Sequence, residues 1–571
     1  MGEYLAPGVY VEEFESGPKA MEGVGTSTAG FVGLAARGPV VGRPVLVTNF
    51  ADYQRRFGGF LPELEFGAYR YMPNCAEQFF TNGGTALYIM RVVPEDATAA
   101  KSQDGPVVVE AKDPGAWANT MQVFLTGSVR AKTQIMAVND SANGKQYQLK
   151  NAAGFRAGDL VALRMPDSVT YNKITEVNGL SVTMAEPLPD DAVDVSLVPT
   201  KLLEACGVDA VVRWSDREEQ YPGCSLNPNA PDYLENALER STLASIKLTL
   251  DDNITAPLTL LGAGEGVEEL CIELSGGFNG TMDQVNAGTF NGVDNGPGKR
   301  TGIEAFQEIT DVSIMAVPGV TIPEVQAKLI AHCEGLTSRF AVLDAPLEAT
   351  GVDDLNKHRS AYDSSYAALY APWVRVYDAL LKRPTFIPPS GSICGIYART
   401  DVERGVHKAP ANEVVRSCTG LSVAYNAAEQ GKLNPNGVNL IRAIKGQGIR
   451  VWGARTCSSN SIWKYVNVRR LFIFLEESIR ANTGWVVFEP NDEGLWSRVR
   501  GSLELFLKTQ WRNGALAGAT EGEAFYVDVG RGTMSQDDID NGRLICLIGV
   551  APVKPAEFVI FRITQKTQDV T

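Results

Sequence analysis

Histidine is almost absent from this chain of 571 residues. Only three occur, His332, His358 and His407, and none has the spacing of a metal-binding motif. His332 precedes Cys333, but a single His-Cys pair is more typical of a packed helix than of a metal site. No GxSxG nucleophile motif is present either. We therefore expect no catalytic residues, no metal site and no enzyme activity.

Phosphate-binding loops are also missing. Residues 296–301, GPGKRT, lack the four-residue spacer of a P-loop, and Arg300 stands where Ser or Thr would hold Mg²⁺. Residues 262–266, GAGEG, lack the dinucleotide-binding spacing, and their glutamate would repel phosphate. The sequence therefore predicts no nucleotide and no other cofactor.

Long apolar runs are absent as well. No stretch reaches the about 18 residues that predict a membrane-spanning helix, and Met1 is not followed by the basic and apolar segments of a secretory signal. The nine cysteines form no CxxC pair, which fits a reducing compartment. These absences predict synthesis in the cytoplasm and no membrane insertion.

Positive charge is scarce overall but unevenly distributed. The net charge of −15 disfavours nucleic acid as a partner. Residues 1–374 carry 27 Lys and Arg against 48 Asp and Glu, whereas residues 375–571 carry 25 against 19. A basic last third can steer the protein toward an acidic partner, although a solvated surface without a partner explains the same count.

The sequence does contain two apolar, strand-like chain ends. Residues 542–566, GRLICLIGVAPVKPAEFVIFRITQK, hold two β-rich runs around a Pro-Val-Lys-Pro corner, and residues 4–14, YLAPGVYVEEF, form a short extended run. Chain ends are usually polar, so both ends should pair with other strands. Two alternatives stay open: exchange of strands between copies by β-augmentation, and pairing within one subunit.

The pattern of apolar runs and turn residues along the sequence predicts a multidomain protein of mixed α/β class. Residues 1–22 form an extended arm and residues 23–96 the first part of the core. Short alternating runs predict an all-β insertion, a barrel or a sandwich, over residues 97–200. A strand–helix–strand order predicts an α/β middle domain with a parallel βαβ unit over residues 201–372. Residues 373–571 form the C-terminal core domain and its arm.

One helix is predicted over residues 494–511. It gathers apolar side chains on one broad arc, while Arg498, Lys508 and Arg512 share another. Docking on an acidic protein surface is one interpretation of this basic face. The ordinary solvent-facing side of an amphipathic helix is the other.

Eight blocks of sequence carry a more specific signal. They are YLAPGVYVEE (4–13), TAGFVGLAARGP (28–39), NGGTALYIMRV (82–92), PPSGSICGIYARTDVERGVHKAPAN (388–412), LNPNGVNLIRAIKGQGIRVWGART (433–456), YVNVRRLFIFLEESI (465–479), WVVFEPND (485–492) and GRLICLIGVAPVKPAEFVIFRI (542–563). In this order they resemble contractile tail sheath proteins, the sheath subunits of myophage tails, tailocins and contractile injection systems. The likeness covers about residues 1–95 and most of 340–571, and nothing is carried over for the segment 97–200.

The resemblance implies a structural and mechanical protein. Sheath subunits stack as hexameric rings in a helical array around an inner tube, and their two arms add strands to a neighbour's C-terminal domain. Carried over to this chain, the inter-subunit strand exchange falls on Val9, Tyr10, Val11, Glu12, Phe558, Val559, Ile560 and Phe561. Residues 15–25, ESGPKAMEGVG, have the composition of the flexible linker that such a mesh needs.

The partners implied are further copies of the chain, an inner tail tube protein, baseplate proteins and a tail terminator or cap protein. The resemblance implies assembly in the bacterial cytoplasm, and the product would be part of a phage virion tail or a released contractile injection particle. The resemblance gives the basic last third a partner in an acidic tube surface, and our candidates for that contact are Arg498, Lys508 and Arg512.

Two functions of other classes stay open. An α/β hydrolase-like enzyme in residues 201–372 would need a concave cluster of titratable groups with shifted pKa values. The insertion at 97–200 would suit a module that binds surface glycans or receptors, although plain stabilisation is the more ordinary role of such an insertion.

Overall fold

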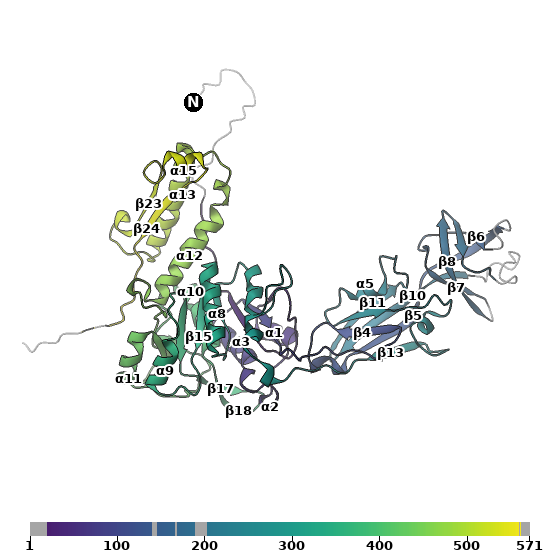
Figure 1. Cartoon of the computed structure of the whole chain (residues 1–571), viewed down its shortest axis with the longest axis horizontal. Coiled ribbons are helices and arrows are strands. Elements are labelled where there is room, and N and C mark those ends of the chain that lie inside the picture. Colours follow the sequence, from purple (N-terminus) through teal and green to yellow (C-terminus); the bar gives the residue numbers. More distant parts are fainter. Residues whose placement is uncertain (1–19, 140–144, 166–167, 189–201, 559, 561–571) are drawn as a thin grey trace, which may run out of the picture. The chain divides into compact units, whose positions relative to one another are not determined.

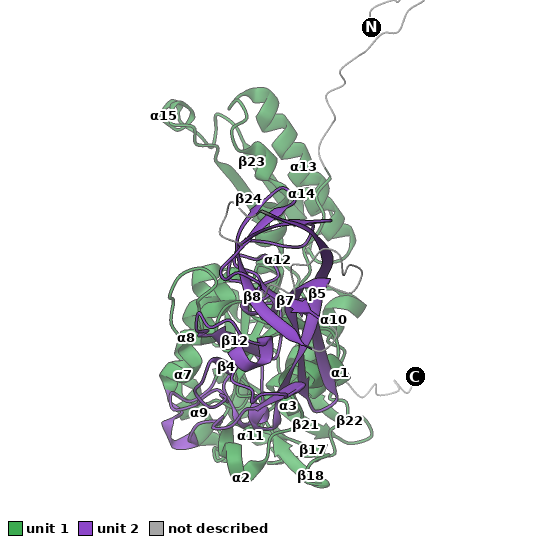
Figure 2. Ribbon diagram, turned by 90° about the vertical axis from the view of Figure 1, so that its right-hand side faces the viewer, with its two compact units in different colours: residues 1–35, 40–92, 287–571 green, residues 36–39, 93–286 purple. Residues whose placement is uncertain are grey.

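The computed structural model describes residues 20–139, 145–165, 168–188, 202–558 and 560. The chain divides into two compact units, coloured separately in Figure 2. Unit 1 comprises residues 1–35, 40–92 and 287–571, and unit 2 comprises residues 36–39 and 93–286. Unit 2 is therefore an insertion into the chain of unit 1.

A nine-stranded sheet forms the centre of unit 1. Its strand order is β19-β22-β21-β16-β15-β14-β1-β3-β2, and the six strands from β21 to β3 run parallel. The strands are β1 (Ala29–Gly33), β2 (Val45–Val47), β3 (Leu87–Arg91), β14 (Ile314–Ala316), β15 (Phe340–Asp344), β16 (Ala367–Ala371), β19 (Glu413–Val414), β21 (Val438–Ile444) and β22 (Gly448–Val451). Apolar runs buried on both faces, such as AGFVG in β1, are typical of parallel strands.

Helical segments cover both faces of this sheet. Phe31, Ile89 and Phe340 point to one face, in a cluster with residues of α3 (Met72–Thr81) and α10 (Ser390–Arg404). Gly30 points to the other face, where a side chain would collide with Phe306 of the 3₁₀ helix η6 (Gly302–Glu308). The remaining helices of this part are α1 (Phe50–Phe57), α2 (Glu63–Phe66), α7 (Ala287–Asn291), α8 (Pro323–Leu336), α9 (Val352–Arg359) and α11 (Ala427–Leu433).

Unit 1 also contains a small antiparallel sheet and a C-terminal lobe (Figure 1). The sheet has the order β18-β17-β20, with β17 (Val374–Asp378), β18 (Arg383–Ile387) and β20 (Gly420–Leu421). The lobe contains α12 (Val466–Asn482), α13 (Glu493–Arg512), α14 (Glu521–Ala524), β23 (Phe525–Val529), α15 (Gln536–Asp540) and β24 (Cys546–Val550). Leu471, Phe506 and Phe525 belong to the apolar cluster that joins α12, α13 and β23.

Unit 2 is built on two long antiparallel strands, β5 (Gln122–Asn139) and β10 (Leu202–Trp214). At one end they close a ring with β6 (Gln146–Leu149), β7 (Leu160–Arg164), β8 (Val169–Asn178) and β9 (Ser181–Met184). At the other end they pair with β13 (Glu269–Glu273) and β11 (Arg217–Cys224). The ribbon of β4 (Val107–Ala111) and β12 (Ala244–Leu248) and the helices α5 (Leu234–Leu238) and α6 (Pro257–Leu260) complete the unit. Each end has its own apolar cluster.

Several expected elements are confirmed. The parallel βαβ unit is formed by β14, α8 and β15, and the helix expected over residues 494–511 is α13. The insertion is rich in strands, as the alternating runs predict, and its closed barrel is completed by β10, which lies beyond residue 200.

Among the described residues, no helix combines the length and the apolar character that a membrane span requires.

The division of the chain differs from the expected middle domain at residues 201–372. Residues 202–286 belong to unit 2, and residues 287–372 belong to the central sheet of unit 1. The physical reason is β10, which pairs with β5 along its whole length and so ties the segment after residue 201 to the barrel. A strand's own sequence does not identify its partner, so the boundary could not be located from pattern alone.

Candidate assembly interface

The C-terminal lobe carries a β-ribbon of only two strands. β23 and β24 pair antiparallel, with Phe525 opposite Val550 at one end and Val529 opposite Cys546 at the other. Among the described residues no third strand pairs with either of them. A two-stranded ribbon leaves unpaired N–H and C=O groups along its outer edges, which can template further strands.

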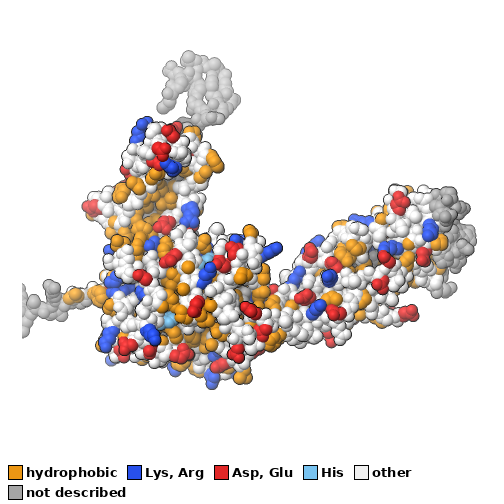
Figure 3. All heavy atoms as spheres, viewed as in Figure 1, with side chains coloured by type: hydrophobic (Ala, Val, Ile, Leu, Met, Phe, Trp, Pro, Cys, Tyr) orange, Lys and Arg blue, Asp and Glu red, His pale blue; other side chains and the backbone are white. Residues whose placement is uncertain are grey.

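The two faces of this ribbon differ. Val527 and Ile548 contact the apolar clusters of α12 and α13, whereas Tyr526 is 62% exposed and Leu547 is 52% exposed on the opposite face. The Tyr526 ring covers Gly549, where a side chain would collide with it. The inner face of the ribbon therefore packs against the lobe. The face that carries Tyr526 and Leu547, and the outer edges of the two strands, remain open to a further strand. Figure 3 shows hydrophobic side chains on the visible surface of this lobe.

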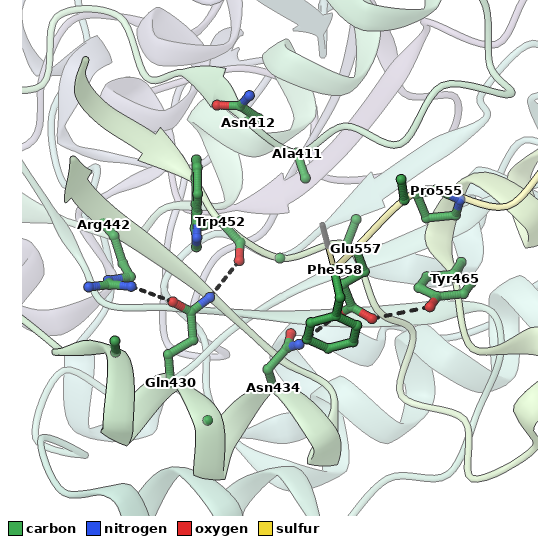
Figure 4. Close-up of a pocket in the computed structure, with 15 residues that line it drawn as sticks. Ala411, Asn412, Gln430, Asn434, Arg442, Trp452, Tyr465, Pro555, Glu557 and Phe558 are labelled. Carbon is green, nitrogen blue, oxygen red and sulfur yellow. Dashed lines mark hydrogen bonds between the residues drawn. The ribbon is translucent and has the colours of Figure 1, made fainter. Parts of the chain in front are cut away.

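The chain leaves the ribbon through a charged anchor at Glu557. The carboxylate accepts hydrogen bonds from Arg455 Nε (2.8 Å) and Nη2 (2.6 Å), from Asn434 Nδ2 (2.6 Å) and from the Tyr465 hydroxyl (3.1 Å). The side chain of Arg455 is only 7% exposed, and its Nη1 donates to the carbonyl of Asn434 (3.0 Å). We call this set of contacts the C-terminal anchor. Figure 4 shows Glu557 pointing toward Asn434 and Tyr465.

The electrostatics of the C-terminal anchor favour the ionised carboxylate. Partial burial raises the pKa of Glu557, but the hydrogen bonds from Arg455 and Asn434 outweigh burial, so that the pKa lies below its usual value. A bidentate guanidinium–carboxylate pair is among the stronger polar contacts in proteins. A cavity of about 620 Å³ lies beside the anchor and is lined in part by Trp452 and Phe558.

A second anchor holds the chain just before β1. The Thr26 hydroxyl donates to Asp401 Oδ2 (2.7 Å), and its carbonyl accepts from Arg470 Nη2 (2.9 Å). Asp401 and Arg470 form a bidentate ion pair whose side chains are 4% and 3% exposed. The backbone N–H of Val24 donates to the hydroxyl of Ser478 (3.1 Å). We call these contacts, together with those of Glu22 described below, the N-terminal anchor.

This finding limits the flexible linker expected at residues 15–25. The described part, residues 20–25, contacts α12, and Met21 packs against the apolar clusters of the lobe. Residues 15–19 lie outside the described residues.

The basic face of α13 is more neutral than its sequence suggests. Arg498 lies 3.3 Å from the carboxylate of Glu489, and Lys508 lies 2.7 Å from that of Glu521. Arg512 is exposed at the last turn of the helix. The three cations share the solvent-facing side of α13, as expected, but two of them have acidic partners within their own subunit.

Only part of the expected strand-exchange set is described. Phe558 is 72% exposed and Ile560 is 78% exposed, and neither belongs to a strand. The other residues predicted for strand exchange lie outside the described residues: Val9, Tyr10, Val11, Glu12, Val559 and Phe561.

The residues of both anchors were missed by the sequence analysis. Thr26 and Asp401 are 375 positions apart, and no pattern links them. A weak signal was present in α12, where Arg470, Ser478 and Asn482 are spaced by multiples of four and share one face of the helix.

Two consecutive family models match this chain. The phage tail sheath protein central domain matches residues 295–457, and the phage tail sheath C-terminal domain matches residues 458–566. Among curated proteins, the tail sheath protein of Escherichia phage P2 is 24% identical over 311 residues, which cover 52% of this chain and 74% of that protein. The tail sheath protein of Burkholderia phage BcepMu is 27% identical over 256 residues, which cover 41% of this chain and 54% of that protein.

Solved structures extend the likeness to the whole chain. The sheath of an extracellular contractile injection system, the PVC sheath complex in its contracted state, superposes with a TM-score of 0.53 at 20% identity and covers 99% of both chains. The contracted helical sheath of the anti-feeding prophage gives a TM-score of 0.52 at 21% identity, with 98% and 99% coverage. At these identities the comparison shows a common fold.

Proposed function

This chain belongs to the contractile tail sheath family and is a structural sheath subunit, and we propose that it polymerises as stacked hexameric rings around an inner tube. In this proposal the polymer shortens to drive the tube through a target cell envelope. The relatives are structural proteins, which disfavours the hydrolase-like alternative. Its neighbours in the particle would be further copies, the tube, the baseplate and a terminator or cap protein.

The observation that carries the proposal is the β23–β24 ribbon. Its inner face packs on α12 and α13, whereas its outer edges have no strand partner among the described residues. Incoming strands from two neighbours would complete it by β-augmentation, in which main-chain hydrogen bonds supply affinity and side-chain pockets supply specificity. The strand donors in this proposal are the arm around Val9–Glu12 and the arm around Phe558–Phe561.

The driving force that we propose for contraction is burial of surface between subunits. An extended sheath would be metastable, held by weak contacts between subunits and tube, and the contracted lattice would bury more surface between rigid units. A small gain per subunit would then be multiplied along the polymer, while the exchanged strands transmit the movement from ring to ring.

Electron microscopy of the purified protein tests this function directly. We expect ring stacks or striped tubes with six-fold symmetry and, in high-resolution maps, a β23–β24 ribbon extended by strands from neighbouring copies. A protein that stays monomeric at every concentration, salt and pH, with no tubes in the presence of its tube protein, would contradict the proposal.

A further inference from the structure

The segment before β1 lies along one face of α12. Arg470, Phe474, Ser478 and Asn482 are four residues apart and form a single stripe on the helix. Thr26 contacts Arg470, Val24 contacts Ser478 and Glu22 contacts Asn482, so the segment runs antiparallel to α12. The amide of Asn482 makes two bonds with the backbone of Glu22, accepting from its N–H (3.3 Å) and donating to its carbonyl (2.8 Å).

Polar contacts hold this segment because its packing is incomplete. A cavity of about 470 Å³ and another of about 390 Å³ are both lined by Val24, Gly25 and Thr26. Besides Met21, which packs on the apolar clusters of the lobe, a close apolar contact lies at Gly23, where an added Cβ would lie 2.7 Å from the Phe474 ring. At Gly25 an added Cβ would meet nothing within 4 Å. Gly23 therefore sets how near the chain can approach α12.

The segment that leaves the ribbon attaches to the other end of the same helix. Tyr465, the residue that caps α12, donates to Glu557. Asn467 in the first turn is 2% exposed and donates to the carbonyl of Val553 (3.3 Å). From Asn467 to Asn482 the helix spans about 22 Å at 1.5 Å per residue. One continuous, hydrogen-bonded element thus connects the two anchors.

We propose that α12 is the common tether of the two assembly arms, with the N-terminal and C-terminal anchors as the points where tension enters and leaves the subunit. This inference rests on the proposed strand exchange, since without neighbours the arms carry no tension. In a polymer, force arriving through one arm passes along the hydrogen-bonded axis of α12 to the other arm, without passing through unit 2. The positioning residues are Asn482 at the C-terminal end of α12 and Arg455 and Glu557 at its N-terminal end, and Asp401 with Arg470 fixes the segment near that N-terminal end.

Two single substitutions test the anchors. Gly23→Ala separates the incoming segment from Phe474, and Glu557→Gln removes the charge held by Arg455. Their matched controls are Gly25→Ala, which meets nothing, and Lys554→Gln, an exposed neighbour of Glu557. A further variant, Asn482→Ala, removes two bonds to Glu22 while keeping a good helix former. Thermal unfolding of each unassembled subunit checks that it is folded.

The readout is the rate at which preformed tubes lose subunits in dilute urea, measured by sedimentation. We expect Gly23→Ala, Asn482→Ala and Glu557→Gln each to raise this rate about tenfold, an effect of the size of one or two lost hydrogen bonds, with the controls at the wild-type rate. Because the anchors act in series, failure of either one releases the arm, so Gly23→Ala combined with Glu557→Gln should lose subunits at about the sum of the two single-variant rates, about twentyfold. Independent structural effects would instead multiply.

The outcomes separate the two levels of the proposal. Wild-type protein that forms no tubes would overturn the proposed function and the tether with it. Wild-type tubes that lose subunits at the same rate in all variants, or a double variant whose effects multiply, would overturn the tether alone.

Discussion

Glu557 illustrates how one side chain fixes the direction of a chain segment. Its pKa is lowered in the folded protein, so its contribution is fully present above the unfolded value of 4.5 and is lost as the pH falls through the folded value. Its side chain is 19% exposed, so solvent weakens the ion pair only in part. At neutral pH the carboxylate of Glu557 is therefore ionised and keeps its hydrogen bonds to Arg455 and Asn434.

We predict that Glu557→Gln lowers the free energy of unfolding of unit 1 by about 1–2 kcal/mol at pH 7. The difference from wild type should shrink below pH 4.5, because the protonated carboxyl of the wild type then resembles the amide. Urea unfolding at a series of pH values measures it. A difference that stays constant down to the lowest accessible pH would exclude charge as the cause.

At the scale of elements, α3 and α10 are packed unusually closely through glycine. An added Cβ at Gly391 would lie 2.5 Å from the carbonyl oxygen of Cys75, and one at Gly395 would collide with the backbone of Phe79. These glycines are four residues apart, so they lie on the same face of α10. Backbone atoms cannot rotate out of the way as a side-chain end can.

We predict that Gly391→Ala destabilises unit 1 by about 1–3 kcal/mol, the usual cost of overpacking. The control is Gly431→Ala in α11, where an added Cβ meets nothing within 4 Å. Alanine has the higher helix propensity, so this variant should be up to about 1 kcal/mol more stable than wild type. Chemical denaturation of both variants gives the comparison, and equal effects of the two substitutions would refute the close-packing argument.

The solvent-facing side of α13 gives a prediction about the tube. We expect the double substitution Arg498→Glu, Arg512→Glu to weaken tube-templated assembly about tenfold or more at low salt, since it reverses charge at two positions of the proposed contact. Co-sedimentation with the tube protein measures it. Arg531→Glu, at a 75% exposed position in the same lobe, is the control. Normal extended sheaths from the double variant would refute this contact.

Elements whose signal lies within one segment were predictable from the sequence. The apolar arc of α13 and the order of β14, α8 and β15 depend on local periodicity, and the structure contains both. Pairing between distant segments was not predictable. The pairing of β10 with β5 and the hydrogen bond between Thr26 and Asp401 join residues that are far apart in the sequence. The local sequence around one partner does not identify the other.

The charge of the candidate site was only partly predictable. A helical projection places Arg498 and Lys508 on one face, but it does not reveal their acidic partners, Glu489 in the segment before α13 and Glu521 at the start of α14. Counting the cations on the helix projection therefore overestimated the net positive charge of this face. Buried pairs such as Arg470 with Asp401 likewise look like ordinary surface charges until the fold buries them.

At the scale of the whole molecule, the two units have separate apolar cores. The clusters in unit 2 and the cluster around the central sheet of unit 1 share no residue. We therefore predict two unfolding transitions in calorimetry. Leu125→Ala, at a fully buried position of unit 2, should shift only one of them and cost about 2–5 kcal/mol. A single transition that shifts as a whole would show that the units unfold together.

Removal of the N-terminal arm tests whether strand exchange between subunits is needed for stable tubes. Deletion of residues 1–19 leaves Met21, Glu22 and the rest of the N-terminal anchor in place. We expect a folded subunit with an unchanged melting temperature that forms no stable tubes, because one strand donor is missing. Sedimentation and electron microscopy measure this, and fully contractile tubes from the truncated protein would contradict strand exchange.

Because unit 2 is inserted between β3 and β14, the ribosome makes the strands of the central sheet in two parts, separated by the synthesis of unit 2. β1 lies between β14 and β3 in the sheet, yet the whole of residues 93–286 must leave the ribosome before β14 can arrive. At about 5–20 residues per second this interval lasts about 10–40 s. During that time the edge of β1 that pairs with β14 stays open, and at its end unit 2 is complete while unit 1 still lacks β14. Early emergence of the insertion thus makes it the first part of the nascent subunit able to fold.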